Sequence, residues 1–306
     1  MTTVLVTGGA GFIGSHVVDL LISEGYKVAV VDDLSTGSLK NLNQEKIDFY
    51  NVSILDKEFN ALAKSIKPSY IIHLAAQANV VNSINFIVDD AAINILGTVN
   101  VIDAAKSNDV KKIVYASSAA VYGDPMELPI KISHPINPKS PYGLSKYTAE
   151  LYLQMAKQKY AIDYTILRYS NVYGPRQIHT HGEGGVVNTF FKYILDNQRP
   201  YIYGDGNQTR DFIYVKDVAR ANLKALELAS GKTLNVSSGS SISINALFDM
   251  IISITGREVS PIYCAPRNSD IKHSVLDNSL TKIELDWYPE FDLRKGLEET
   301  LKEFFL

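Results

Sequence analysis

The chain has little cysteine, and this scarcity limits the chemistry available to it. Cys264 is the only cysteine among 306 residues, so the chain can form neither an internal disulfide nor a thiolate metal cluster. The six histidines show no spacing typical of metal ligands, and His179 and His181 are interpreted as solvated residues of a glycine-rich loop. We therefore predict no metal site and a reducing, cytoplasmic environment.

An excess of one charge and a long apolar run are also missing. The 30 basic and 33 acidic residues leave a formal net charge of −3, so no overall field attracts nucleic acid or an anionic membrane. No apolar run reaches the roughly 18 residues that span a bilayer, and the first residues do not resemble a signal peptide. We expect one large domain or two coupled ones, with neither nucleic acid nor membrane as a partner.

What the sequence does contain begins with a glycine-rich turn. Residues 2–7 are predicted to form a buried strand and residues 12–23 an apolar helix, with Gly8, Gly11 and Gly14 at their junction. Glycines at this spacing allow a tight turn, a close approach of backbone to a pyrophosphate, and close packing of helix on strand. The first N–H groups of the helix would face the phosphates. The pattern predicts a dinucleotide site.

Two carboxylates, Asp32 and Asp33, follow the strand predicted at 27–31. Asp32 lies about 20 residues beyond the glycines, where a carboxylate accepts hydrogen bonds from the adenine ribose. A phosphate on that ribose would meet two negative charges. The pattern therefore favours NAD over NADP.

Strands and helices alternate along the rest of the chain. Further strands are predicted at 47–52, 70–74, 111–116, 163–168, 201–203 and 233–236, and further helices at 56–66, 89–107, 141–159, 186–196, 215–229, 243–254 and 293–305. This alternation is typical of an α/β fold with a doubly wound parallel sheet (Rossmann), which binds ligands at the carboxyl ends of its strands. We expect a smaller, interwoven lobe after Gly174.

Tyr142 and Lys146 are four residues apart on the predicted helix 141–159, so both side chains lie on one face. The pKa of tyrosine is about 10, and lowering it to about 7 takes roughly 4 kcal/mol. One cation about 4 Å away supplies roughly that amount in an effective dielectric near 20. Lys146 is the candidate cation, and an oxidised nicotinamide ring would be a second. Ser118 adds a hydroxyl at the preceding strand end.

In this order on one α/β frame, the glycine turn, Asp32, Ser118, Tyr142 and Lys146 resemble the extended short-chain dehydrogenase/reductase family. Within it, the chain is similar over essentially its whole length to the nucleotide-sugar epimerases typified by UDP-glucose 4-epimerase. The segments that carry the resemblance are TGGAGFIG at 7–14, DDLSTG at 32–37, NILGT at 94–98, LRYSNVYGPR at 167–176, RDFIYV at 210–215, and Pro266-Arg267 with Asp270.

The resemblance implies an NAD-dependent enzyme in which Tyr142 is the acid/base on the sugar hydroxyl. Ser118 would share a hydrogen bond with the same oxygen, and Lys146 would hold the nicotinamide ribose and lower the pKa of Tyr142. Ser53 stands where many members have an acidic residue that meets the adenine amine, so its contact would be weaker. The residues implied in binding NAD are Gly8, Gly11, Phe12, Ile13, Gly14, Asp32, Asp33, Leu34, Ser35, Thr36, Gly37, Ser53, Ile54, Leu74, Ala75, Ala76, Gln77, Asn94, Tyr142, Lys146 and Tyr169.

The resemblance also implies a nucleotide-sugar substrate, most simply a UDP-hexose. Asn171, Arg210 and Arg267 would meet the diphosphate, Tyr203 the base, and Asp270 the ribose hydroxyls. Val186 and Val187 would line the base pocket through backbone and side chain. Ser274 stands where a bulky residue often excludes N-acetylated sugars, which suggests room for a 2-acetamido group. With Ser118 and Tyr142, these complete the implied substrate site.

Two further properties are implied. Residues 1–172 with about 212–236 would form the NAD-binding domain, and about 173–211 with 237–306 the nucleotide-sugar-binding lobe. Relatives form homodimers by packing two long helices, here 89–107 and 141–159, from which Leu151 and Tyr152 would point outward.

Ala119 and Ala120 bear on the reaction. Dehydratase relatives have an Asp-Glu pair here and decarboxylating relatives a glutamate, whereas two methyl groups cannot transfer protons. This favours 4-epimerisation through a 4-keto intermediate, on UDP-glucose and UDP-galactose or on the N-acetylhexosamine pair. Another nucleotide-sugar modifier (4,6-dehydratase, decarboxylase or uronate epimerase) and a noncatalytic NAD-binding regulatory protein are the alternatives, and uracil is not distinguished from thymine.

Overall fold

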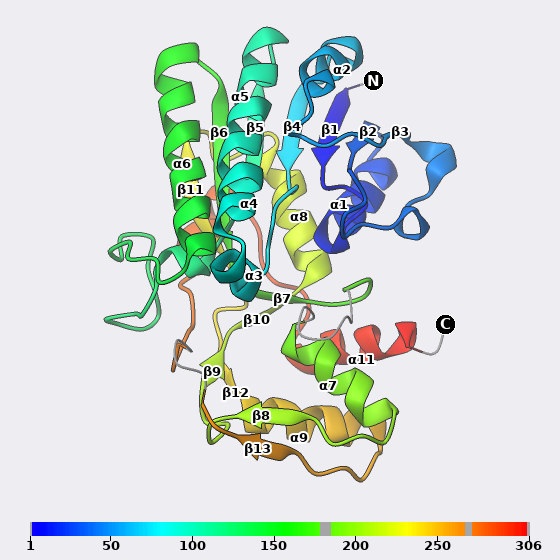
Figure 1. Cartoon of the computed structure of the whole chain (residues 1–306), viewed down its shortest axis with the longest axis vertical. Coiled ribbons are helices and arrows are strands. Elements are labelled where there is room, and N and C mark those ends of the chain that lie inside the picture. Colours follow the sequence, from blue (N-terminus) through cyan, green and yellow to red (C-terminus); the bar gives the residue numbers. More distant parts are fainter. Residues whose placement is uncertain (1, 178–184, 267–270, 305–306) are drawn as a thin grey trace.

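A seven-stranded, entirely parallel sheet forms the upper part of the molecule in Figure 1. The structure is a computed structural model and describes residues 2–177, 185–266 and 271–304. The strand order is β11-β6-β5-β4-β1-β2-β3. The strands are β1 (Thr3–Thr7), β2 (Lys27–Val31), β3 (Asp48–Tyr50), β4 (Tyr70–His73), β5 (Lys112–Ser118), β6 (Asp163–Tyr169) and β11 (Lys232–Val236). The chain thus has the predicted doubly wound α/β fold.

Helices cover both faces of this sheet, which is why its strands are apolar almost throughout. Val4 and Val6 belong to one core, under α1 (Phe12–Ser23) and α8 (Val215–Ala225), and Leu5 belongs to the other. The second core lies under α2 (Glu58–Ile66), α5 (Gly97–Ser107) and α6 (Pro141–Tyr160). Alternate residues of each strand therefore stabilise opposite layers.

The helix predicted at 89–107 differs from a single regular helix. It comprises α4 (Ile87–Ala91), a π-helical turn (Ala92–Leu96) and α5, and α3 (Val80–Asn85) precedes it unpredicted. The Asn79 side chain caps α3 by accepting a hydrogen bond from Asn82 N at 3.0 Å. Val80 and Val81 are exposed on this helix, so its apolar residues do not show the one-sided pattern of a helix that packs on a core.

The lower part of Figure 1 is a second lobe built on its own apolar core. It contains α7 (Val186–Leu195), α9 (Ile244–Thr255) and α11 (Leu293–Glu303), while α10 (Ser279–Leu285) packs on β11. Its short strands form three pairs: β7 (Asn171–Tyr173) with β10 (Phe212–Tyr214), β8 (Tyr201–Tyr203) with β13 (Ile262–Cys264), and β9 (Thr209–Arg210) with β12 (Ile242–Ser243). Strands this short carry almost no periodic signal, and only β8 was predicted.

Helix α1 is tied to the segment that enters the lower lobe. His16 Nε2 lies 3.0 Å from Pro175 O, and Arg176 Nη1 lies 2.8 Å from Asp19 Oδ2. Arg176 N also donates to Glu303 Oε2 at 2.7 Å, which attaches α11 to the same corner. Because α1 starts at the glycine turn, these contacts set the lobe at a defined position against the predicted cofactor site.

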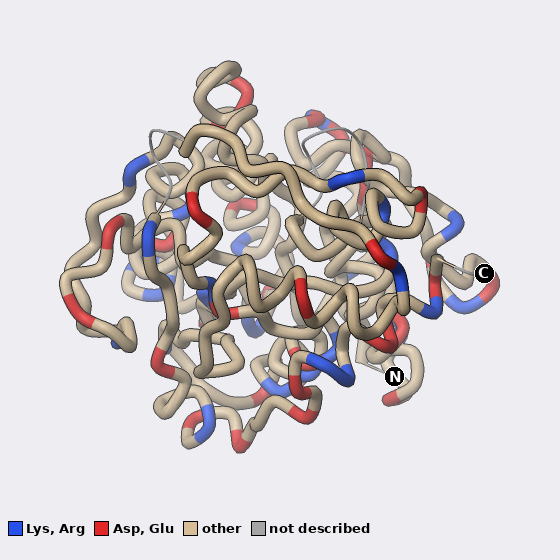
Figure 2. Tube along the Cα trace, turned by 90° about the horizontal axis from the view of Figure 1, so that it is seen from below, with Lys and Arg blue, Asp and Glu red and all other residues tan. Residues whose placement is uncertain are grey.

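Basic and acidic residues are intermixed along the trace in Figure 2, with no region of one sign. Within the described part of the chain, no helix combines the length and apolar character needed to cross a bilayer.

Candidate active site

The predicted site residues gather at the carboxyl edge of the sheet. Thr7, the last residue of β1, pairs with Val31 of β2 and His73 of β4, so the loops that follow these strands leave the sheet at one level. Ser118 ends β5 opposite Tyr169 of β6. Strand order reverses between β1 and β4, which is where doubly wound sheets open a crevice for ligands.

The glycine turn is packed too closely for any side chain. Gly8 has φ +70, and a Cβ there would lie 2.5 Å from Ala75 N in the loop after β4. A Cβ on Gly14 would overlap Gly8 O and the Gly9 backbone. At Gly11, which precedes α1, no side chain caps the helix, so its first N–H groups are available to an anion. This cradle fits a pyrophosphate.

Asp32 fastens the glycine turn to the next loop. Its carboxylate is buried and accepts hydrogen bonds from Ala10 N (2.9 Å) and Leu34 N (2.8 Å). Burial raises the pKa of Asp32, although these N–H donors act in the opposite direction. Each carboxylate oxygen accepts more than one hydrogen bond, so ribose hydroxyls can still bind here. Gly37 must lack a Cβ, which would lie 2.8 Å from Asp32 Oδ1.

The loop after Asp32 and the segment after β3 border the same crevice. Asp33 Oδ1 accepts from Ser35 N (3.0 Å) and Ser35 Oγ (2.6 Å), which shapes the loop that contains Thr36. Ser53 N donates to Asp56 Oδ2 at 2.8 Å, and Ile54 is buried beneath it.

Beyond β4, the backbone of residues 74–77 is held by Asn94. Gln77 N donates to Asn94 Oδ1 at 3.0 Å, and Asn94 Nδ2 donates to Gln77 O at 2.9 Å. Asn94 Nδ2 also lies 3.0 Å from Ser145 Oγ on α6. Asn94 therefore joins the loop that flanks the glycine turn to the helix that carries Tyr142.

The structure brings Ser118, Tyr142 and Lys146 together. Helix α6 starts at Pro141, with Ser140 Oγ accepting a hydrogen bond from Gly143 N at 3.1 Å. Tyr142, in its first turn, is half-buried and hydrogen-bonded to the Ser118 side chain. Lys146 is buried and donates to Ala116 O at 2.8 Å, with Nζ 6.0 Å from the centre of the Tyr142 ring. This cluster closes one side of the crevice.

In the chain without a bound cofactor, burial has the largest effect on the pKa of Tyr142. Burial raises the pKa of Tyr142; the Ser118 hydrogen bond lowers it and the negative charge of Asp90 raises it further. Lys146 Nζ lies 6.0 Å from the centre of the ring, and burial of the phenol opposes the lowering of its pKa that we expect from this ammonium together with an oxidised nicotinamide. Burial also lowers the pKa of Lys146, to about 8, against the opposite effects of Asp90 and Glu150. Positive charge from Lys146 and from an oxidised nicotinamide would favour the phenolate.

The predicted substrate residues that the structure describes come from several segments of the lower lobe. Asn171 and Tyr203 are exposed, and Arg210 Nη1 donates to Thr209 O at 2.9 Å. Ser274 N bonds to Thr209 O at 3.1 Å, so it lies beside Arg210. Arg267 and Asp270 lie outside the described residues.

Val187 requires a correction. Val186 and Val187 were expected to line the base pocket through backbone and side chain, but the Val187 side chain is 1% exposed and belongs to the core of the lower lobe, which leaves only its backbone for that contact. Val187, Phe190, Phe191 and Ile194 form the apolar stripe of α7 at i, i+3, i+4 and i+7, which packs against α9. Val186 is only partly buried, so it alone of the two valines can present a side chain to a ligand.

Several residues of the site were not singled out from the sequence. Asn222 of α8 is one of them: its Oδ1 accepts a hydrogen bond at 3.0 Å from the hydroxyl of Tyr169, a residue that was expected near the cofactor. Glu150 pairs with Arg168 (Nε to Oε1, 2.9 Å) directly below Lys146, and Asp90 bonds Asn94 Nδ2 at 3.1 Å. Of these residues, only Asp90 could have been found from local spacing, because it precedes Asn94 by four residues on one helix.

The glycine cradle allows a direct test. Gly14→Ala is expected to lower NAD content and affinity at least tenfold, because the added methyl group displaces Gly8 from the turn. The measurement is the NAD released on denaturation, with titration of the stripped protein. Gly25→Ala, where φ is +79 and nothing lies within 4 Å, is the control: it should cost roughly 1 kcal/mol of stability and leave NAD content unchanged. Equal NAD content in the two variants would contradict the assignment.

Comparison with known proteins agrees with this geometry. Over 307 residues, the chain is 40% identical to the UDP-glucose 4-epimerase of Mycolicibacterium smegmatis, covering 98% of this chain and 97% of that protein. A structure of UDP-glucose 4-epimerase from Thermotoga maritima with UDP-glucose superposes with a TM-score of 0.97 at 42% identity, covering 99% of both chains. The UDP-N-acetylglucosamine 4-epimerase of Methanobrevibacter ruminantium, solved with UDP-N-acetylmuramic acid, gives 0.95 at 39% identity, covering 99% and 98%. Residues 4–237 match the NAD dependent epimerase/dehydratase family, and the chain belongs to that family.

Proposed function

We propose that this protein is an NAD-dependent 4-epimerase of UDP-hexoses that acts through a 4-keto intermediate. The observation that carries the proposal is the cluster of Tyr142, Ser118 and Lys146 beside the glycine cradle. Relatives 40% identical over nearly the full length are UDP-glucose 4-epimerases, which supports the same reaction here.

The residues of the crevice fit NAD. The glycine turn and the start of α1 would hold the pyrophosphate, Asp32 the adenine ribose, and Lys146 the nicotinamide ribose. When bound there, NAD would supply reversible hydride transfer with a sugar carbon. Gly8 and Gly14 have no room for a side chain, so backbone alone would face the pyrophosphate there.

Tyr142 would remove the proton from the O4 hydroxyl and later return it. The Ser118 hydroxyl, which already bonds the phenol, would share the developing charge on the same oxygen. Burial disfavours the phenolate in the chain alone, and the positive charges of Lys146 and of an oxidised nicotinamide would offset that cost. Tyr142 would therefore act as a base mainly when the site is loaded.

The segment after Ser118 favours epimerisation over elimination. Ala119 and Ala120 form a short 3-10 turn there, and Ala120 O packs so closely against Gly143 that a Cβ on Gly143 would lie 2.5 Å away. Neither alanine can transfer a proton, so the general acid of a 4,6-dehydratase and the glutamate of a decarboxylase have no counterpart at these positions. The retained Tyr142, Ser118 and Lys146 argue against a noncatalytic regulatory protein.

We infer that the lower lobe binds the nucleotide sugar. Asn171 and Arg210, with Arg267, would hold the diphosphate, because guanidinium groups form paired hydrogen bonds with phosphate oxygens. Val186 and Tyr203 would adjoin the base, and Asp270 its ribose. In this division, residues 1–172 with about 212–236 bind NAD and the remainder binds substrate.

A substrate panel tests the function. UDP-glucose, UDP-galactose and the two UDP-N-acetylhexosamines should each be converted to a 4-epimer of unchanged mass without net redox, with the products identified by NMR. The small side chain of Ser274 predicts activity on the acetylated pair, and Ser274→Tyr should reduce that activity at least tenfold while retaining UDP-glucose turnover. Loss of water or of carbon dioxide from a product would refute the proposal.

Tyr142→Phe is expected to lower kcat by about 100-fold to 10,000-fold, the usual contribution of a positioned acid/base, while NAD stays bound. Tyr147→Phe is the matched control, since Tyr147 lies on the same helix and packs on the cluster around Tyr122. Full turnover by Tyr142→Phe, or NAD loss from it, would contradict the role given to the phenol.

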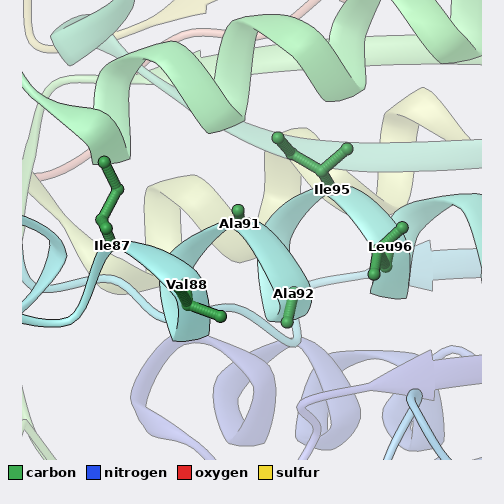
Figure 3. A pocket seen from close by; sticks show the side chains of 6 residues that line it. All are labelled: Ile87, Val88, Ala91, Ala92, Ile95 and Leu96. Carbon is green, nitrogen blue, oxygen red and sulfur yellow. The ribbon is translucent and has the colours of Figure 1, made fainter.

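We further propose a homodimer that packs through α4, the π-helical turn and α6. Figure 3 shows the side chains of this stretch in two rows at i, i+4 spacing: Ile87, Ala91 and Ile95, and Val88, Ala92 and Leu96. Val88 is 75% exposed and Leu96 58%, and Leu151 on the adjacent α6 is also exposed. An apolar face this large is typical of a subunit interface, and the two alanines let a partner helix approach closely.

Val88→Asp is expected to weaken the dimer about 100-fold or more, because an unpaired carboxylate in an apolar interface costs several kcal/mol. Light scattering after size exclusion measures the mass. Ile283→Asp on α10, at a side chain 78% exposed and away from this face, is the control and should leave the mass unchanged. A wild-type monomer at all concentrations would refute the interface.

We also propose that the protein works in the cytoplasm and requires neither nucleic acid nor membrane. The near balance of 30 basic and 33 acidic residues supports this, since it produces no strong overall field to attract a polyanion.

A further inference from the structure

Asp90 is a buried carboxylate with only neutral hydrogen-bond donors. It lies on α4 and is 1% exposed. In the described part of the chain, its side-chain donors are two amides: Gln77 Nε2 at 2.9 Å and Asn94 Nδ2 at 3.1 Å, both to Oδ1. Removing a carboxylate from water is costly unless another charge compensates it. The compensating charge must therefore come from beyond its hydrogen-bond partners.

Lys146 is the buried cation on which the charge of Asp90 acts, and α4, which carries Asp90, packs against α6, which carries Lys146. Its ammonium is surrounded by Glu150 and Tyr142 from α6, Tyr115 from β5 and His73 from β4. Burial lowers the pKa of His73 to about 3, so this imidazole is neutral at physiological pH. Tyr115 is a neutral phenol, because burial raises its pKa well above the usual value. Only Asp90 and Glu150 supply negative charge.

Glu150 is paired with another cation, Arg168. Its two oxygens pair with Arg168 Nε (2.9 Å) and Nη2 (2.5 Å), and Oε1 also accepts from Ser117 Oγ at 2.5 Å. Arg168 thus neutralises Glu150. Asp90 has no such partner, so its charge is the one left to act on Lys146 and Tyr142.

Asp90 is also connected, through hydrogen bonds, to the first turn of α6, which contains Tyr142. Asn94 Nδ2, which bonds Asp90, lies 3.0 Å from Ser145 Oγ, and Ser145 Oγ donates to Tyr142 O at 3.1 Å. Asn94 is in the π-helical turn, a feature often found at functional sites because it changes the direction of side chains.

We propose that Asp90 is a positioning residue of this site, the buried counter-ion of Lys146 that also holds the Tyr142 turn of α6 through Asn94 and Ser145. The inference rests on the acid/base role proposed for Tyr142. On this proposal, the charge of Asp90 sets the pH range in which the enzyme is active.

The direction of the effect follows from the sign of the charge. Asp90 raises the pKa of Lys146 and also that of Tyr142. Without it, Tyr142 forms its phenolate at lower pH, so the acid limb of the pH–rate profile moves to lower pH. Lys146 also loses its proton at lower pH, so the alkaline limb moves the same way. The whole profile should shift to acid by about one pH unit, the smaller end of the effect of a close charge.

The experiment compares pH profiles of kcat/KM on UDP-glucose. Asp90→Asn and Asp90→Ser both remove the charge and should shift both limbs to acid, and Asp90→Ser keeps the test available if the amide variant does not fold. Asp90→Glu restores the charge and should return the profile to its wild-type position. Asp103→Asn, at an exposed carboxylate on α5, is the matched control and should not move it. Unmoved limbs in the two neutral variants, or an equal shift in Asp90→Glu, would overturn the proposal.

A second measurement separates this inference from the reaction itself. Ultraviolet difference absorbance of the NAD-loaded protein, with Tyr142→Phe as reference, reports the titration of the phenol without turnover. A shift to acid in Asp90→Asn supports the role of Asp90 even if no UDP-sugar is epimerised, whereas an unshifted titration refutes it even if the enzyme is active.

Discussion

The buried phenol of Tyr142 is the constraint on which the rest of the site depends. Desolvation keeps it protonated, and its one hydrogen bond, to Ser118, does not reverse that preference. Lys146 is buried as well, and burial lowers its pKa to about 8. In the proposed mechanism, Lys146 and an oxidised nicotinamide would supply the positive charge that favours the phenolate, and the turn with Gly8 and Gly14, which have no room for a side chain, would hold the dinucleotide. NAD binding and the activation of Tyr142 as a base would therefore depend on the same site.

Helix α6 has one buried face and one exposed face. Its buried face carries Lys146 and Glu150 against β5 and β6, and its exposed face carries Leu144 and Leu151. On the neighbouring α4, Asp90 is likewise buried and Val88 is exposed. In the proposed dimer, the helices that form the interface are therefore those that hold the catalytic groups. Packing of a second subunit would restrict the motion of both.

The lower lobe contributes in a different way. Its short strand pairs and α7–α9 core form an apolar unit in which Tyr203 and Asn171 remain exposed, while α1 holds its entry segment through His16 and Asp19. Asp211 joins three separate segments, since it accepts from Ser170 Oγ (3.2 Å), Ser238 N (3.0 Å) and Leu276 N (3.2 Å). Residues distant in sequence are thereby brought to one position beside the end of β6.

The sequence by itself determined the features that depend on local spacing. Glycines three apart predict the turn, apolar runs alternating with helical patterns predict the parallel sheet, and a four-residue spacing places Tyr142 and Lys146 on one helix face. Tertiary structure decided the rest: the raised pKa of Tyr142, the burial of Val187, and the position of Asp90 opposite Lys146. Periodicity and turn chemistry act between neighbours along the chain, whereas desolvation and charge pairing depend on which distant segments exclude water from one another.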